Sequence, residues 1–158
     1  MAMIEFQVPG IGKVEIKNVV FDLNGTLSMN GTISQDVEKK IRQLAQKVNV
    51  FIMSSDTRGN LKELADRLGI DYRRVSSSPE NVAKEKFVEE LGPENTIAVG
   101  NGKNDELMLK KAKLGIAVIG EEGACSSAIL NADIIVINPI HALELIMDPQ
   151  KIIATLRT

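Results

Sequence analysis

The sequence contains no tryptophan, one cysteine and one histidine among its 158 residues, and aromatic residues make up only 3% of it. The single cysteine, Cys125, excludes an internal disulfide framework and a cysteine-based zinc site. The single histidine, His141, leaves little material for a histidine-based metal site. A metal bound by this chain would therefore need ligands that are mainly oxygen atoms.

A strong charge of one sign and a long hydrophobic run are also missing. Nineteen basic and 21 acidic residues leave a net charge of −2, which gives no electrostatic reason to expect nucleic acid or an anionic membrane as a partner. No apolar run approaches the roughly 18 to 20 residues of a membrane span. The N-terminus has neither the basic region nor the apolar stretch of a signal peptide. We therefore expect a cytoplasmic protein with no membrane or nucleic-acid partner.

The chain has the length of one domain and an ordinary hydrophobic content of 44%. No internal repeat or interdomain linker interrupts it, so we predict a single domain over residues 1–158. Apolar residues alternate within residues 4–8 and 13–16, on either side of a glycine-containing turn at residues 9–12. This pattern predicts an N-terminal β-hairpin within residues 1–17.

Short apolar runs rich in β-branched residues recur after the hairpin, and segments with helical spacing of apolar residues lie between them. The runs cover residues 19–22, 48–53, 96–99, 115–119 and 133–137. Runs that are apolar on both faces suit the central strands of a parallel sheet covered by helices. We therefore predict an α/β fold, a three-layer Rossmann-like domain with a central, mostly parallel sheet.

Polar segments stand at the predicted ends of three strands, at residues 22–26, 54–57 and 100–105. Parallel strands bring their carboxyl ends to one edge, where ligands bind in such sheets. Each segment alone could be only a turn or a helix cap. Together they supply carboxylates that suit magnesium, and hydroxyls, glycine amides and a lysine that suit a phosphoryl group. The conjunction favours magnesium-assisted phosphoryl transfer.

The same segments resemble the motifs of the haloacid dehalogenase-like phosphohydrolases, and within them the phosphorylation domain of P-type ATPases. Residues 22–27, Asp-Leu-Asn-Gly-Thr-Leu, resemble the motif Asp-Lys-Thr-Gly-Thr-Leu. Residues 54–56, Ser-Ser-Asp, stand where the ATPases have Thr-Gly-Asp, and residues 100–105 resemble Gly-Asp-Gly-x-Asn-Asp. The resemblance covers roughly residues 18–147 and leaves out the hairpin.

This resemblance implies a role for each motif residue. Asp22 would be the nucleophile that forms an aspartyl-phosphate. The implied Mg²⁺ ligands are Asp22, the backbone carbonyl of Asn24, Asp105 and the loop residue Asn101. Ser54 would hydrogen-bond the phosphoryl oxygens, and a lysine would neutralise the developing charge. The remaining motif residues that we expect to contact the phosphorylated substrate are Ser55, Gly25 and Thr26.

Two lysines are candidates for the charge-neutralising role. Lys84 shares a helical face with Phe87, Val88 and Leu91. That face packs on the sheet, so a lysine in its first turn can reach the strand ends. Lys86 falls on the face predicted to meet solvent, and a purely solvated role for Lys84 is the alternative. We choose Lys84.

Two substitutions depart from the family pattern. Asn24 stands where most phosphatases of this family have an aspartate that acts as general acid and base, which predicts slow hydrolysis of the phosphoenzyme. Asn101 replaces another aspartate and should weaken cation binding. The main hypothesis is a slow magnesium-dependent phosphatase. A phosphotransferase, or a weakly catalytic binding or regulatory module, remains the alternative.

The spacing also leaves little room for a cap domain. Only residues 28–34 separate the nucleophile loop from the first predicted helix. Cap domains select substrates in larger relatives, so selection here would come from the hairpin, the substrate's own bulk or a second subunit. The substrate, a phosphorylated small molecule or macromolecule, and assembly into a homo-oligomer both remain open at this point.

Overall fold

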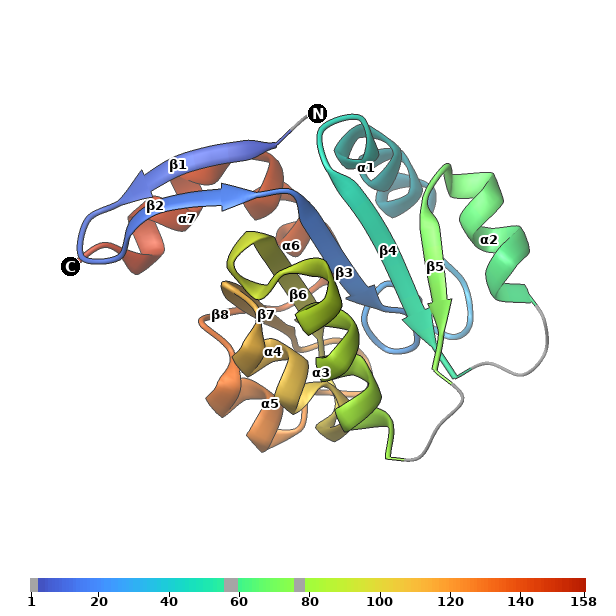
Figure 1. Ribbon diagram of the computed structural model, residues 1–158. Helices are drawn as coiled ribbons and strands as arrows, with labels where there is room; N and C mark the ends of the chain where they lie inside the picture. The colour runs from blue at the N-terminus through green and yellow to red at the C-terminus, as the bar shows by residue number, and fades with distance from the viewer. Residues whose placement is uncertain (1–2, 56–59, 76–78) are drawn as a thin grey trace.

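The computed structural model describes residues 3–55, 60–75 and 79–158. Six parallel strands form the central sheet in the order β5-β4-β3-β6-β7-β8, and two antiparallel strands form a separate hairpin, β1-β2 (Figure 1). The strands are β1 (Ile4–Val8), β2 (Gly12–Ile16), β3 (Asn18–Asp22), β4 (Asn49–Ser54), β5 (Asp71–Arg74), β6 (Thr96–Gly100), β7 (Leu114–Val118) and β8 (Ile134–Val136).

Helices connect successive parallel strands. They are α1 (Gln35–Ala45), α2 (Asn60–Leu68), α3 (Glu80–Leu91), α4 (Glu106–Lys111), α5 (Ser126–Asn131), α6 (Pro139–Met147) and α7 (Pro149–Leu156). Short 3-10 turns, η1 (Pro93–Asn95) and η2 (Lys103–Asp105), precede β6 and α4. Ser34 caps α1 by accepting a hydrogen bond from Val37 N–H, and Asp148 separates α6 from α7, which begins at Pro149.

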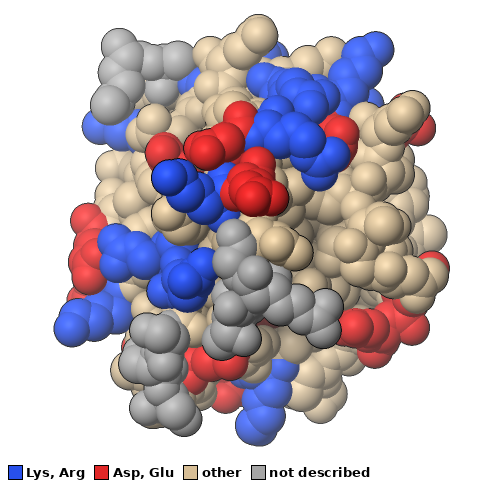
Figure 2. All heavy atoms as spheres, turned by 90° about the vertical axis from the view of Figure 1, so that its right-hand side faces the viewer, with Lys and Arg blue, Asp and Glu red and all other residues tan. Residues whose placement is uncertain are grey.

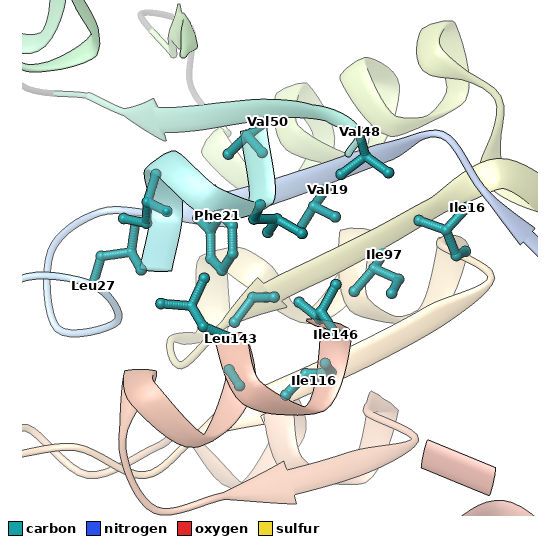
Figure 3. Close-up of a cluster of buried hydrophobic side chains, with 14 of the residues drawn as sticks. Ile16, Val19, Phe21, Leu27, Val48, Val50, Ile97, Ile116, Leu143 and Ile146 are labelled. Carbon is teal, nitrogen blue, oxygen red and sulfur yellow. The ribbon is translucent and has the colours of Figure 1, made fainter. Parts of the chain in front are cut away.

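Two apolar layers cover the two faces of the sheet. On one face, Val19, Phe21 and Ile97 pack against Leu143, Ile146 and other buried residues (Figure 3). This larger core also contains residues of α1, α2, α7 and the hairpin. On the other face, alternate strand residues such as Val20 pack against α3, α4 and α5. The three layers confirm the predicted α/β architecture.

The hairpin closes the amino end of the sheet. The backbone N–H of Lys17 donates to Asn95 O at 2.8 Å, and the N–H of Asn49 donates to Lys17 O at 2.9 Å. Helix α7 lies beside β1 (Figure 1), and the N–H of Thr158 donates to Pro9 O at 3.1 Å. The predicted N-terminal hairpin is thus confirmed and belongs to the main core.

The structure adds one strand and confirms the compact connections. Strand β5 was not among the predicted runs, because it is an edge strand whose four residues are all exposed and mostly polar. Pro79 lies at the N-cap of α3. No large cap domain interrupts the described chain, and none of its described helices is long and apolar enough to cross a membrane.

Candidate active site

A buried lysine and two buried carboxylates meet at the carboxyl end of the sheet. Asp22 is the last residue of β3, and Asp105 ends the short turn η2 that follows β6. The Nζ of Lys84 lies 3.0 Å from Asp22 Oδ1 and 2.8 Å from Asp105 Oδ1. Lys84 is 1% exposed and Asp105 is fully buried, so this cluster places two carboxyl groups and one amino group inside the protein.

Burial sets the protonation of this cluster. Desolvation, with added repulsion from Asp105, raises the pKa of Asp22 to about 7, although Lys84 pulls it down. Burial alone would lower the pKa of Lys84, but the two carboxylates outweigh that effect and raise it above its usual value. Lys84 therefore stays charged at neutral pH, while Asp22 is poised between its two states.

Lys84 points into this cluster because it lies on the apolar face of α3, which packs against the sheet. Phe87 and Val88 are buried on the same side of α3 as Lys84 and pack in the smaller core. Lys86 is exposed and lines a separate hollow between α3 and β5. The structure thus brings Lys84, and not Lys86, to Asp22.

Thr26 and Asn101 form the other side of the cluster. The Thr26 hydroxyl lies 3.2 Å from Asp22 Oδ2 and 3.2 Å from Asn101 Oδ1. A hydroxyl has one proton, so it can donate to only one of these two oxygens at a time. This side of the cluster therefore holds more acceptors than donors, which is the kind of place that a cation can occupy.

Asp105 has a different environment from Asp22. Its Oδ2 accepts hydrogen bonds from Asn101 N–H at 3.0 Å and Gly102 N–H at 3.1 Å, while its Oδ1 accepts one from Lys84. Gly100 must be a glycine here, since a Cβ at that position would lie 2.5 Å from the Asp105 carboxyl carbon. Asp105 thus anchors both Lys84 and the loop that carries Asn101.

The remaining predicted residues lie around this cluster. Ser54 is buried at the end of β4, directly after the residue that pairs with Asp22. Ser55 is exposed beyond that strand end, and Asp56 and Thr57 lie outside the described residues. Asn24 is exposed at the opening of the site, and Gly25 is buried with its N–H donated to Ser28 O.

The predicted residue set omitted Glu122, which lies in the loop after β7. Gly25 has a φ of 77°, and a Cβ there would overlap Glu122 Oε2 and lie 2.8 Å from Asn101 Nδ2. The carboxylate of Glu122 therefore lies over the nucleophile loop, next to Asn101. The sequence held a signal for it, because residues 120–123 also follow a predicted strand end.

A cavity of about 550 Å³ opens beside Asn24, between residues 23–33 and α2. Leu23, Ile33 and Leu64 give it apolar walls, and Asn60, Glu63 and Arg67 add polar groups. Its volume lies in the range of small-molecule sites. Arg67 is engaged by Glu38, with its Nη1 2.8 Å from Glu38 Oε1.

The oxygen atoms at this end of the sheet fit a hard divalent cation such as Mg²⁺. Asp22, Asn101 and the backbone of the nucleophile loop offer oxygen ligands, which Mg²⁺ prefers, and Mg²⁺ keeps part of its water shell with only one or two carboxylates. Within the described residues, no group of three or more acidic, histidine or cysteine side chains is placed to hold a metal by itself. The residues therefore fit a cation that remains partly hydrated.

Comparison with known proteins places this arrangement among hydrolases. Residues 28–113 match the model of the haloacid dehalogenase-like hydrolase family. An uncharacterized protein of Methanocaldococcus jannaschii is 51% identical over 92 residues, which are 56% of this chain and 97% of that protein. A soluble P-type ATPase-like phosphatase of the same organism is 30% identical over 116 residues, 72% of this chain. The match spans only 42% of that phosphatase.

Solved structures share the fold. One neighbour is the 3-deoxy-D-manno-octulosonate 8-phosphate phosphatase of Moraxella catarrhalis, in complex with a magnesium ion, a phosphate ion and a KDO molecule. It superposes with a TM-score of 0.72 over 88% of this chain and 90% of its own, at 19% identity. At that identity the likeness establishes the common architecture.

Proposed function

Because the chain belongs to the haloacid dehalogenase-like hydrolases, we propose that it is a magnesium-dependent phosphatase that works through an aspartyl-phosphate on Asp22. The observation that carries the proposal is the buried contact of Lys84 with both Asp22 and Asp105 at the carboxyl end of the sheet. The buried lysine supplies the positive charge that phosphoryl oxygens need, and the acceptor-rich side formed by Asp22, Thr26 and Asn101 suits the cation.

In the first step, a carboxylate oxygen of Asp22 attacks phosphorus while the bond to the leaving oxygen breaks. Lys84 neutralises charge that builds on the phosphoryl oxygens, and the hydroxyl of Ser54 donates a hydrogen bond to them. Asp105 keeps Lys84 charged and in position. Asp22, Asn101 and the backbone of the nucleophile loop would hold a Mg²⁺ ion, which would supply further positive charge to stabilise the phosphoryl oxygens. The leaving oxygen takes its proton from solvent, because the Asn24 amide has none to give near neutral pH.

In the second step, water attacks the phosphorus of the aspartyl-phosphate and releases phosphate and free Asp22. A general base would take a proton from that water, but the exposed Asn24 amide can only orient it. Acid–base help is typically worth about 10²- to 10⁴-fold. Slow hydrolysis and an accumulating phosphoenzyme follow. Because Asn24 cannot activate water, the phosphoryl group could instead pass to an acceptor that carries its own base. The protein would then be a phosphotransferase.

The cavity beside Asn24 is the place we assign to the leaving group. Its volume of about 550 Å³ suits a small organic alcohol rather than a folded macromolecule. On the face that carries α2 and β5, basic and acidic side chains are interspersed (Figure 2). A phosphorylated small molecule is therefore the substrate class that we propose.

Mass spectrometry of the intact protein after incubation with Mg²⁺ and acetyl phosphate tests the proposal. We expect a phosphoryl adduct on the unchanged protein and none on Asp22→Asn. Hydrolysis of p-nitrophenyl phosphate, followed in parallel, detects turnover that outruns trapping. An adduct on both proteins would move the nucleophile elsewhere. Neither adduct nor hydrolysis would leave the binding or regulatory module as the better description.

A further inference from the structure

The loop after β7 is hydrogen-bonded to Asn101, on the side of the candidate site that a cation can occupy. The backbone O of Asn101 accepts a hydrogen bond from Cys125 N–H at 2.8 Å, and its Nδ2 donates to Gly123 O at 3.4 Å. Within the loop, Gly123 N–H donates to Gly120 O at 2.9 Å, which closes a tight turn. Glu121 and Glu122 are the two central residues of this turn.

The turn also packs on the nucleophile loop. A Cβ at Gly120 would lie 3.2 Å from Gly25 O, and a Cβ at Gly25 would overlap the Glu122 carboxylate. The two glycines thus allow residues 120–123 to approach the backbone that follows Asp22. Both glutamates line a hollow of about 230 Å³ together with Asn24 and Gly25.

The charge at this place is incomplete without Glu122. When Asp22 is ionised, as it must be to bind a cation, Asp22 and Asp105 against Lys84 leave one net negative charge, and the neutral Asn101 adds none. Glu122 has no hydrogen bond or ion pair with any residue that the structure describes, and its side chain is exposed. Its carboxylate raises the net negative charge to two, which balances a divalent cation.

We propose that Glu122 is a cation-holding residue of this site, where it supplies the carboxylate that Asn101 lacks. Because Mg²⁺ retains water molecules, an exposed carboxylate beside Asn101 can act by accepting hydrogen bonds from cation-bound water. The proposal rests on the proposed function, since it concerns the same cation.

Calorimetric titration with Mg²⁺ alone, without substrate, measures this contribution directly. Loss of a group that binds the ligands or water of a metal typically weakens affinity 10- to 100-fold. We expect Glu122→Gln to weaken Mg²⁺ binding by about tenfold. The matched control is Glu121→Gln, which removes the same charge from the same turn and should change affinity by less than about twofold.

A rescue variant tests whether Mg²⁺ binding depends on a carboxylate at this particular place. Asn101→Asp in the Glu122→Gln background restores a carboxylate beside the lost one, on the same side of Gly25, and we expect it to recover most of the lost affinity. Thermal unfolding of each variant checks that the fold is unchanged, which the exposure of Glu122 predicts.

If Glu121→Gln and Glu122→Gln weakened Mg²⁺ binding equally, the effect would come from the loss of one negative charge near the site and not from the position of Glu122. That result would overturn the proposal. Unchanged affinity in Glu122→Gln would also overturn it, while leaving the proposed phosphatase function intact. If the unchanged protein bound no Mg²⁺ yet formed the phosphoenzyme, both the magnesium requirement and the role of Glu122 would be rejected. The nucleophilic role of Asp22 would then stand.

Discussion

The two ends of the central sheet differ in the kind of polar contacts that they contain. At the amino end, Asn49 Nδ2 donates to Asn18 Oδ1 at 3.1 Å, and Asn95 Nδ2 donates to Glu15 O at 2.8 Å. These contacts join neutral amides and carbonyls. At the carboxyl end, two carboxylates share one lysine, and one hydroxyl proton faces two acceptors.

The amino end of the sheet therefore has its polar groups satisfied, whereas the carboxyl end has charge that a ligand can still neutralise. Neutral hydrogen bonds at the amino end satisfy their partners and leave nothing for a ligand. Buried charges at the carboxyl end cost stability unless each is paired. The surplus of negative charge there is removed when a proton or a metal cation binds. The following variants test this contrast, beginning with the largest expected effect.

Lys84→Met should be the most damaging single change. It removes the only cation in contact with Asp22 and Asp105 in the described structure and leaves two uncompensated carboxylates buried. We expect a loss of about 3 kcal/mol in the free energy of unfolding and no detectable phosphoenzyme. Urea denaturation and intact-mass analysis measure the two effects. Lys86→Met is the matched control, and similar losses in it would contradict our assignment.

Asn24→Asp should raise activity. The new carboxyl supplies the acid–base group that the amide lacks, at an exposed position that tolerates the charge. We expect p-nitrophenyl phosphate turnover to rise by about 10²-fold, and the phosphoenzyme to accumulate less. If turnover stayed the same in a folded variant, the missing base would not be the cause of slow hydrolysis.

Asp22→Asn should stabilise the protein while it abolishes phosphorylation. The pKa of Asp22 is raised from 3.8 to about 7, so the native state holds this proton more tightly than the unfolded chain does. Its contribution to stability is full below pH 3.8 and is lost as pH rises through about 7. The asparagine does not titrate. We therefore expect the variant to be more stable by about 1 to 2 kcal/mol at pH 8 without Mg²⁺.

Denaturation at several pH values checks this sign. The stability difference between Asp22→Asn and the unchanged protein should open as pH rises from about 4 to about 8. A gap that widened toward low pH would show that Asp22 titrates below its ordinary range.

Asn18→Ala should have the smallest effect and should leave the chemistry alone. It removes the acceptor for Asn49 Nδ2 and the donor to Leu91 O at the amino end. We expect a loss of about 1 kcal/mol in the free energy of unfolding with unchanged phosphoenzyme formation. A matching fall in phosphorylation would mean that the two ends are coupled.

The sequence predicted the parts of the fold that hydrophobic patterning encodes. The central strands β3, β6 and β7 are buried at every position, and each had appeared as an apolar run. Strand β5 escaped because its residues, Asp71 to Arg74, are all exposed and carry no such pattern. An edge strand is fixed by its neighbour β4, and that pairing cannot be seen in the local sequence.

The candidate site was predictable where helical geometry decided the outcome. The spacing of Lys84 with Phe87 and Val88 placed it on the buried face of α3, and the structure has it there. The saturation of Asp105 by backbone N–H groups depends on the shape of the loop at residues 100–105, which spacing alone does not give. The approach of Glu122 to Gly25 depends on contact between two loops far apart in sequence.

The hairpin's contact with α7 affects the order in which this domain is completed during synthesis. Phe6, Val8 and Ile152 belong to one core, although the hairpin is synthesised well before α7. Contacts between such distant segments are slow to form and wait for the later partner. The central sheet can pair before then, but the apolar side of β1 and β2 stays uncovered until α7 emerges. During that interval this surface is open to a chaperone or to aggregation.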